Sequence, residues 1–327
     1  MIIPAYRCSV SMKCWPAVRM CLQAPQNANH SYSVLPRWRV KTLYGQREAA
    51  HGAWTGGSAT LHMIRIGSGN MALISCNFFS EVLKRDVGVN VCIPTPNSDE
   101  LLTVDKAEYY VPGEKFKCVY LLHGAYGDHT NWCRHTRVEK YAEANRVAVV
   151  MPSIENSFCM DMLHGENYRK FVGEELVKFS RYMFPISQKR EENCICGLSM
   201  GGYSAYYVAF HYPHIFGKAA SLSGALDIEA VRTRPELAVK GPFRWEDLYR
   251  PGAQDVDLLT LYNSIEDARP RLYQTCGTED FLYNVNEDIH ARFVQAGADI
   301  RYETGPGKHD WDFWDAHIAA ILAWAAA

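Results

Sequence analysis

The chain contains 327 residues, 48% of them apolar, which is enough for one large domain or two ordinary domains with a sizeable core. Its formal net charge of −2 argues against nucleic acid or an anionic membrane as the main partner. No run approaches the roughly 18–20 apolar residues that a membrane-spanning helix needs, so we expect no membrane span.

The eleven cysteines show no C-x-x-C pair and no regular spacing, which favours reduced thiols over a disulfide framework. Cys194 and Cys196 lie two residues apart on a predicted strand and therefore point to the same face, as buried small apolar residues. Near the N-terminus, Arg7, Lys13 and Arg19 interrupt any apolar leader. These features predict a cytoplasmic protein.

Residues 1–70 differ in composition from the rest of the chain. They carry eight of the 34 Lys and Arg residues but only one of the 36 Asp and Glu residues. They show no hydrophobic periodicity, whereas a coherent pattern begins at Met71. We therefore expect a basic extension over 1–70, disordered or non-native, and a folded domain over 71–327. A genuine accessory module over 1–70 is the alternative.

From residue 71 onward, strands and helices alternate. Two strands, over 74–82 and 87–93, are predicted to pair antiparallel. Buried strands are predicted at 116–122 and 147–151, and further strands at 193–198, 219–222, 271–276 and 300–303. Helices are predicted at 137–145, 166–184, 286–296 and 311–325. Repeated βα units of this kind predict a mainly parallel central sheet with helices on both faces.

The pattern loosens between residues 224 and 270, where Pro235, Pro242 and Pro251 separate short apolar stretches. This segment has too few long apolar runs to form a core of its own. We expect it to be a short cap-like insertion that lies over the functional site.

A G-x-S-x-G pentapeptide, Gly197-Leu-Ser-Met-Gly201, stands between a predicted strand and a helix-forming run. In this context the serine occupies a tight turn at the end of the sheet, and the glycines allow the strand and the helix to approach closely. The pattern predicts that Ser199 is a covalent nucleophile. A glycine-rich turn with a chance serine is the alternative.

A nucleophilic serine needs a base, and the base needs an acid to orient it. His309 lies in a loop directly after the last predicted strand, where a base can reach the serine hydroxyl. Asp280 lies in the loop after the preceding strand and is the predicted acid, with Glu279 as the alternative. The order Ser, Asp, His along the chain is the one expected for an α/β-hydrolase.

A tetrahedral intermediate also needs backbone N–H groups directed at its oxyanion. Met200, directly after the serine, is one predicted donor; Ala125, which follows Gly124 in the loop after strand 116–122, is the other. Four side chains near this loop could instead suggest a metal site: His123, Asp128, His129 and His135. We interpret these four as incidental and expect neither a metal nor another cofactor.

Four further side chains are predicted to line the substrate pocket: Tyr126, Phe158, Met160 and Trp245. They could stack on an aromatic acyl group of the substrate. The alternative is that they pack against the insertion.

Together these segments resemble the branch of α/β-hydrolases that holds esterase D and S-formylglutathione hydrolase, and they are most similar to the bacterial tributyrin esterases. The resemblance spans about residues 71–325. It is carried by the segments 80–83, 89–94, 119–124, 149–152, 197–203, 223–225, 277–283 and 309–314. It implies an α/β-hydrolase fold in which Ser199, Asp280 and His309 form the catalytic triad.

The resemblance also bears on the substrate. The family includes feruloyl and acetyl-xylan esterases, which places plant-polysaccharide-derived esters among the expected small-molecule substrates. Members specific for S-formylglutathione usually carry an H-G-A run after the serine segment, whereas this chain has Tyr203-Ser-Ala. That departure disfavours a thioester substrate. Related esterases are often oligomers, so the chain could form a homo-oligomer.

We therefore predict a serine carboxylesterase that hydrolyses short-chain acyl or hydroxycinnamoyl esters through an acyl-enzyme. The alternatives are an S-formylglutathione hydrolase-type thioesterase and an acyltransferase of the same fold. A third hypothesis is a non-catalytic binding protein on a hydrolase scaffold.

Overall fold

The computed structural model describes residues 70–96, 111–237 and 243–327. The chain divides into two units, 1–61 and 62–327, and the first unit lies outside the described residues. The sequence-based prediction for the basic extension therefore also lies outside them, apart from residue 70, which begins the first strand.

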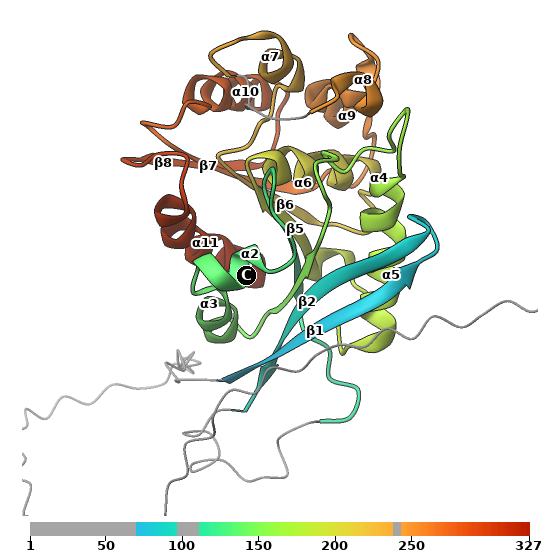
Figure 1. The fold of residues 1–327 in the computed structure, drawn as a ribbon. Helices are drawn as coiled ribbons and strands as arrows, with labels where there is room; N and C mark the ends of the chain where they lie inside the picture. Colours follow the sequence, from blue (N-terminus) through green and yellow to red (C-terminus); the bar gives the residue numbers. More distant parts are fainter. Residues whose placement is uncertain (1–69, 97–110, 238–242) are drawn as a thin grey trace, which may run out of the picture. The chain divides into compact units, whose positions relative to one another are not determined.

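Within the described residues, a sheet of eight strands has the order β1-β2-β4-β3-β5-β6-β7-β8 (Figure 1). The strands are β1 (Asn70–Ser80), β2 (Arg85–Thr95), β3 (Cys118–Leu122), β4 (Ala148–Pro152), β5 (Asn193–Leu198), β6 (Lys218–Leu222), β7 (Arg271–Gly277) and β8 (Ile300–Gly305). β2 pairs antiparallel with both β1 and β4, and the pairs from β4 onward are parallel. The predicted mainly parallel sheet and its antiparallel hairpin are confirmed.

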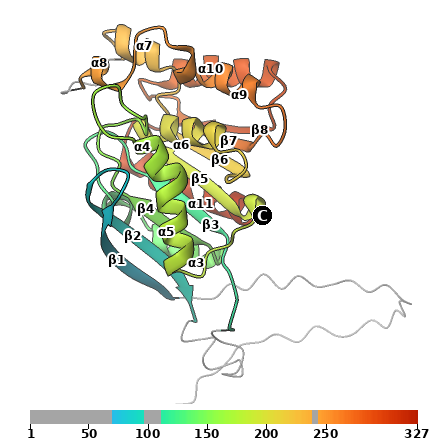
Figure 2. The ribbon, with the colours of Figure 1, turned by 90° about the vertical axis from the view of Figure 1, so that its right-hand side faces the viewer.

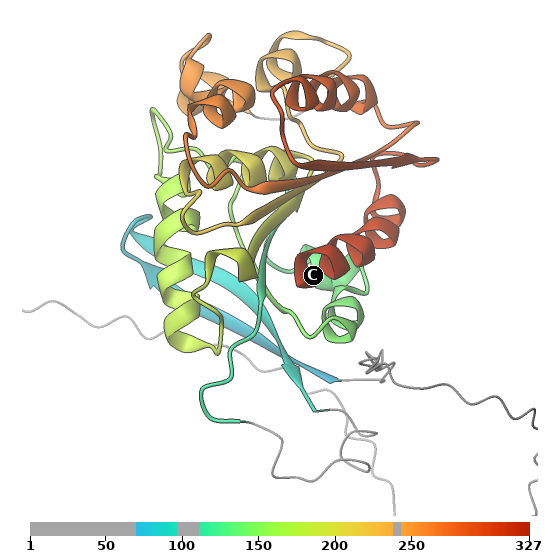
Figure 3. The same cartoon turned by 180° about the vertical axis from the view of Figure 1, so that it is seen from behind.

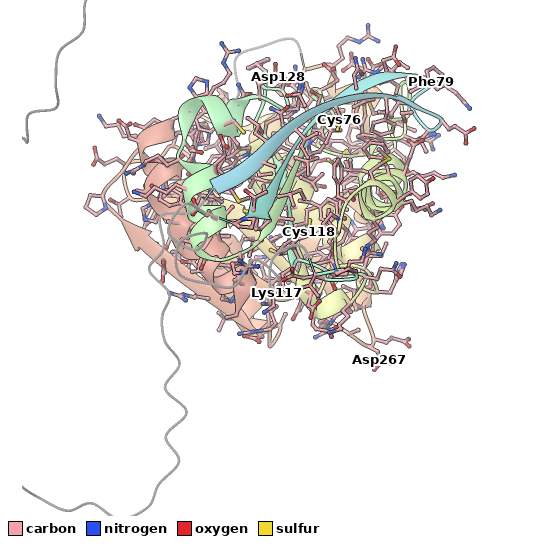
Figure 4. All side chains as sticks on the ribbon, turned by 90° about the horizontal axis from the view of Figure 1, so that it is seen from below. Cys76, Phe79, Lys117, Cys118, Asp128 and Asp267 are labelled. Carbon is pink, nitrogen blue, oxygen red and sulfur yellow. The ribbon has the colours of Figure 1, made fainter. Side chains whose placement is uncertain are left out.

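The central strands are buried on both faces, as expected for parallel strands whose residues are mostly apolar. Every residue of β3, β4, β5 and β6 is buried. At the sheet edge, by contrast, side chains of β1 alternate between solvent and core: Cys76 packs against the core, whereas Phe79 is 60% exposed. Figure 4 shows both residues on the β1–β2 hairpin.

Helices cover both faces of the sheet (Figure 2). They are α2 (Asn131–His135), α3 (Val138–Ala144), α4 (Tyr168–Lys170), α5 (Leu176–Met183), α6 (Met200–His211), α7 (Ile228–Thr233), α8 (Trp245–Leu248), α9 (Leu258–Ser264), α10 (Tyr283–Gln295) and α11 (Trp311–Ala326). One hydrophobic cluster includes residues of α4, α5, α6 and α10, and a second includes residues of α2, α3 and α11. Figure 3 shows α11 in red beside the green helices of the second cluster. Among the described residues, no helix combines the length and apolar character needed to cross a membrane.

The helix predicted at 166–184 is present over residues 168–183, but it is not α-helical throughout. A π-helical turn, Phe171–Glu175, separates α4 from α5. Glu175 on this turn accepts hydrogen bonds from the Ser80 hydroxyl and from the Glu81 N–H, the latter at 2.7 Å. The wider turn therefore carries a carboxylate to the β1–β2 connection, a tertiary contact that helical periodicity does not reveal.

The predicted insertion contains α7, α8 and α9 and adds no strand among its described residues. The Tyr203 hydroxyl on α6 donates a hydrogen bond to the Val256 carbonyl oxygen at 2.7 Å. Leu258 and Tyr262 of α9 are buried in the hydrophobic core. The segment thus shares the core of the main domain, as its short apolar runs predicted.

The turn between β5 and α6 depends on close backbone contacts at Gly201. A Cβ atom at this position would lie 2.4 Å from the His123 carbonyl oxygen and 2.8 Å from that of Leu122. Both distances are shorter than any normal van der Waals contact, and both partners are backbone atoms that cannot rotate away. The second glycine of the pentapeptide therefore allows α6 to approach the end of β3.

We expect Gly201→Ala to lower the free energy of unfolding by about 1–3 kcal/mol, the usual cost of overpacking a well-packed site. Gly305→Ala is the matched control, since a Cβ there would meet no atom within 4 Å, and we expect it to change stability by less than about 0.5 kcal/mol. Urea denaturation followed by circular dichroism measures both. Equal unfolding midpoints for the two variants would contradict the close approach.

Candidate active site

Ser199 occupies a strained turn between β5 and α6. Its backbone angles are φ 54° and ψ −118°, a region that non-glycine residues rarely adopt. Four backbone hydrogen bonds hold it there: its N–H donates to the Leu222 carbonyl at 2.9 Å, and its carbonyl accepts from Gly202 at 3.0 Å, Tyr203 at 3.3 Å and Ala225 at 3.1 Å. The turn directs the hydroxyl away from the sheet, at the carboxyl end of β5.

The structure brings Ser199, His309 and Asp280 together. The carboxyl ends of the parallel strands β5, β7 and β8 lie at the same edge of the sheet, and the three residues follow those strands in turn. His309 Nε2 lies 2.9 Å from Ser199 Oγ. His309 Nδ1 lies 2.8 Å from Asp280 Oδ2 and 3.0 Å from Oδ1. The three side chains therefore form one continuous hydrogen-bonded chain.

The carboxylate determines which nitrogen of His309 carries the proton. An ionised carboxylate only accepts hydrogen bonds, so Nδ1–H donates to Asp280 and Nε2 is left to accept from the Ser199 hydroxyl. Asp280 is 5% exposed, and its Oδ1 also accepts the Leu282 N–H at 2.8 Å. Glu279, the alternative acid, is exposed and has no hydrogen bond to His309 among the described residues.

Aromatic rings hold the imidazole of His309 between them. Phe281 lies 4.6 Å from it, centroid to centroid, and Trp314 meets it at 5.0 Å with an interplanar angle of 88°. Trp314 is itself fixed, because its Nε1–H donates to Ser223 Oγ at 3.1 Å. This packing restricts the ring to orientations that keep both of its hydrogen bonds.

Helix α11, which begins two residues after His309, is anchored at both ends. At its start, the Asp310 carboxylate accepts the Phe313 N–H at 3.1 Å, an N-cap that ends the histidine loop. At its end, the buried amine of Lys218 donates to the carbonyl oxygens of Trp324 at 3.2 Å and Ala325 at 2.9 Å. A cation at this end also interacts favourably with the helix dipole.

The two predicted oxyanion donors lie beside the serine. Met200 is the first residue of α6, so its N–H has no partner within the helix. Gly124 lies against the serine, since a Cβ built on it would be 3.4 Å from Ser199 Cβ. In the part of the chain that the structure describes, neither the Met200 N–H nor the Ala125 N–H has a hydrogen-bond acceptor. Both donors are therefore available to a ligand.

The histidines near this loop bind protein groups. His123 Nδ1–H donates to the Gly124 carbonyl at 2.6 Å, and its Nε2 accepts the Ile154 N–H at 2.9 Å. Burial lowers the pKa of His123, which favours the neutral ring that this pattern requires. His129 Nδ1 hydrogen-bonds Ser153 Oγ at 2.8 Å, and His135 stacks on Trp311.

No group of three or more potential metal ligands occurs within residues 70–96, 111–237 and 243–327. The metal-site alternative for the histidine loop thus has no cluster of ligands to support it among these residues.

A cavity of about 560 Å³ opens over Ser199, a volume typical of small-molecule sites. It is lined by Gly124, Ala125, Tyr126, Gly127, Asn131, Leu198, Ser199, Glu236, Phe281, His309, Trp311 and Trp314. Four aromatic side chains line part of its wall, Tyr126, Phe281, Trp311 and Trp314, and the serine hydroxyl and the imidazole of His309 are among its polar groups.

Of the four side chains predicted to contact the substrate, only Tyr126 lines this cavity. Phe158 and Met160 are each 1% exposed and belong to the hydrophobic core. Trp245 packs 5.4 Å from Phe158, centroid to centroid. The prediction that Phe158, Met160 and Trp245 contact the substrate is therefore corrected: none of the three lines the cavity, because the insertion folds onto the 154–160 loop, where the rings of Phe158 and Trp245 pack against each other and Met160 is buried.

Sequence reasoning missed several residues of the cavity wall. Phe281 directly follows Asp280, and Trp311 and Trp314 follow His309 within five residues, so this spacing could have identified all three. Glu236 and Asn131 gave no such signal: Glu236 lies in an irregular part of the insertion and Asn131 begins α2, and neither is close in the chain to a predicted catalytic residue.

Comparisons with known proteins identify the family. The family model described as Putative esterase matches residues 80–325. An acetyl esterase of Caldicellulosiruptor saccharolyticus is 35% identical over 265 residues, which cover 78% of this chain and 98% of that protein. The resemblance drawn from the sequence is thereby confirmed.

Two solved structures from Staphylococcus aureus are similar along their whole length. The fluorophosphonate-binding serine hydrolase F, with substrate bound, superposes with a TM-score of 0.70 at 28% identity and covers 79% of this chain and 100% of its own. An S-formylglutathione hydrolase superposes with a TM-score of 0.67 at 26% identity, with the same coverage. The chain belongs to the Putative esterase family and is a carboxylic ester hydrolase with an α/β-hydrolase fold.

Proposed function

We propose that the protein is a serine carboxylesterase that hydrolyses short-chain acyl esters, with Ser199 as nucleophile, His309 as general base and Asp280 as the residue that orients the base. One observation carries the proposal: an unbroken chain of hydrogen bonds runs from Asp280 through His309 to Ser199, at 2.8 and 2.9 Å, and opens on the cavity. The similarity to an acetyl esterase supports a small acyl group.

The reaction proceeds in two halves. Ser199 Oγ attacks the ester carbonyl carbon while His309 Nε2 accepts the hydroxyl proton, and Asp280 stabilises the resulting imidazolium. The N–H groups of Met200 and Ala125 stabilise the tetrahedral oxyanion. The C–O bond then breaks, and the alcohol leaves with the proton from His309. Water, activated by the same histidine, hydrolyses the acyl-enzyme and restores the serine.

The aromatic wall leaves room for hydroxycinnamoyl esters as a second substrate class. The rings of Tyr126, Phe281 and Trp311 surround the cavity, and flat aromatic groups pack well against such rings. A cavity of about 560 Å³ accommodates either an acetyl ester or a phenylpropanoid acyl group. Relative rates on p-nitrophenyl acetate, p-nitrophenyl octanoate and methyl ferulate distinguish the two classes, and a preference for octanoate would contradict both.

The charge of the cavity favours esters of uncharged alcohols over glutathione thioesters. Apart from His309, Glu236 is the only described lining residue whose side chain is ordinarily charged near neutral pH. Its carboxylate repels an anionic leaving group, and glutathione carries two carboxylates and one ammonium group. This observation disfavours the S-formylglutathione alternative.

We expect Ser199→Ala to lower kcat on p-nitrophenyl acetate by roughly 10⁴-fold or more while the chain stays folded, as in other triad knockouts. A fluorophosphonate probe should label the wild type but not this variant, and labelling is read by intact-protein mass spectrometry. Ser264→Ala, an exposed serine on α9, is the control and should retain both activity and labelling. Near-normal hydrolysis by Ser199→Ala would refute the assignment.

We expect Glu236→Gln to raise kcat/KM for the anionic ester 4-acetoxybenzenesulfonate by about three- to tenfold relative to phenyl acetate at low ionic strength. The gain should shrink in about 1 M salt, where the Debye length is about 3 Å. Glu246→Gln makes the same charge change elsewhere in the insertion and should leave the ratio unchanged. An equal change for both esters would show that Glu236 does not select by charge.

A further inference from the structure

The loop that carries the second oxyanion donor adopts a conformation that its own sequence does not favour. Tyr126 has φ 63°, a left-handed backbone angle that is uncommon for a non-glycine residue. The Gly127 N–H closes the turn by donating to the Gly124 carbonyl at 3.2 Å. Such a conformation persists only where surrounding groups hold it.

The two peptide planes on either side of Ala125 are each held by a different side chain. Gly124 C=O and Ala125 N–H belong to one planar peptide unit and point in opposite directions. His123 Nδ1–H donates to that carbonyl at 2.6 Å, which directs the Ala125 N–H away from His123. On the other side, the Tyr126 N–H, which belongs to the next peptide unit, donates to Asn156 Oδ1 at 2.8 Å.

Asn156 stands on a loop that is itself well fixed. Ser157 Oγ donates to the Ile154 carbonyl at 2.6 Å and accepts the Cys159 N–H at 3.1 Å. The Ile154 N–H, in turn, donates to His123 Nε2 at 2.9 Å. The 154–159 loop therefore contacts the oxyanion loop, residues 123–127, at two points: Ile154 hydrogen-bonds His123, and Asn156 hydrogen-bonds Tyr126.

We propose that Asn156 is a positioning residue: it fixes the peptide plane after Ala125 while His123 fixes the plane before it, so that Ala125 cannot rotate between them and its N–H stays directed at the oxyanion before substrate arrives. Asn156 does not line the cavity over Ser199, so it acts through Tyr126 rather than by contact with the ester. Preorganised donors stabilise charge that develops in the transition state and contribute little to binding of the ground state. The proposal rests on the proposed function, in which Ser199 forms a tetrahedral intermediate.

Asn156→Ala tests the proposal, because it removes the acceptor of the Tyr126 N–H. We expect kcat for p-nitrophenyl acetate to fall about 10- to 100-fold with KM changed less than about twofold, as befits a donor that is displaced rather than deleted. Affinity for an alkyl boronic acid, which forms a tetrahedral adduct with the serine, should fall by the same factor as kcat/KM.

Three controls separate this role from a general loss of structure. Asn145 follows the last residue of α3, and its side-chain amide donates to the Tyr141 carbonyl at 2.8 Å. Asn145→Ala removes this hydrogen bond and should leave kcat and boronate affinity unchanged. Hydrogen exchange of the peptide that contains Tyr126 should speed up in Asn156→Ala while exchange in the central strands does not. The thermal midpoint reports whether the variant is folded at the assay temperature.

The outcomes are distinct. If wild-type enzyme neither hydrolyses the ester nor reacts with a fluorophosphonate, the proposed function fails. If the wild type is active and Asn156→Ala has the same kcat, or loses activity through KM with boronate affinity unchanged, the positioning role of Asn156 is overturned. A slower kcat with matched loss of boronate affinity supports it.

Discussion

The strained turn at Ser199 is the constraint on which the rest of the site depends. A positive φ at a serine is unfavourable, and here the backbone hydrogen bonds to Leu222, Gly202 and Ala225 hold it. The bond to Leu222 connects the turn to β6. The bond from Gly202 connects it to the first turn of α6, and the bond from Ala225 connects it to the segment after β6. The conformation is therefore held partly by local bonds within α6 and partly by bonds to residues that the parallel sheet brings beside β5.

The same dependence extends to the groups around the serine. His309 is held by a buried carboxylate and by the rings of Phe281 and Trp314. The helix after it is capped at its start by Asp310 and at its end by Lys218. The site thus consists of loop residues, but each loop is fixed by contacts to a neighbouring element. Loops fixed in this way can hold catalytic side chains in a constant relative position.

Sequence-based prediction succeeded where a strong local pattern coincides with a topological rule. Apolar runs identified the strands, and the Ser, Asp, His order placed Asp280 and His309 after consecutive strands. It failed where a side chain's neighbours come from distant segments. The sequence suggested that Phe158 lines the pocket, but this side chain is buried and packs against the insertion. The π-helical turn at 171–175 carries Glu175, which hydrogen-bonds the β1–β2 connection, and no local pattern predicted this turn.

The sequence by itself determined the mainly parallel α/β fold, and the identities of the three residues proposed for catalysis followed from one pentapeptide and two loops. The reason is that hydrophobic periodicity and glycine-dependent turns are local properties. Only the tertiary structure decided which side chains form the cavity wall and which hold the oxyanion loop. These features depend on contacts between segments far apart in the chain. Asn156 hydrogen-bonds Tyr126, 30 residues earlier, and Glu236 from the insertion lines the same cavity as Trp311.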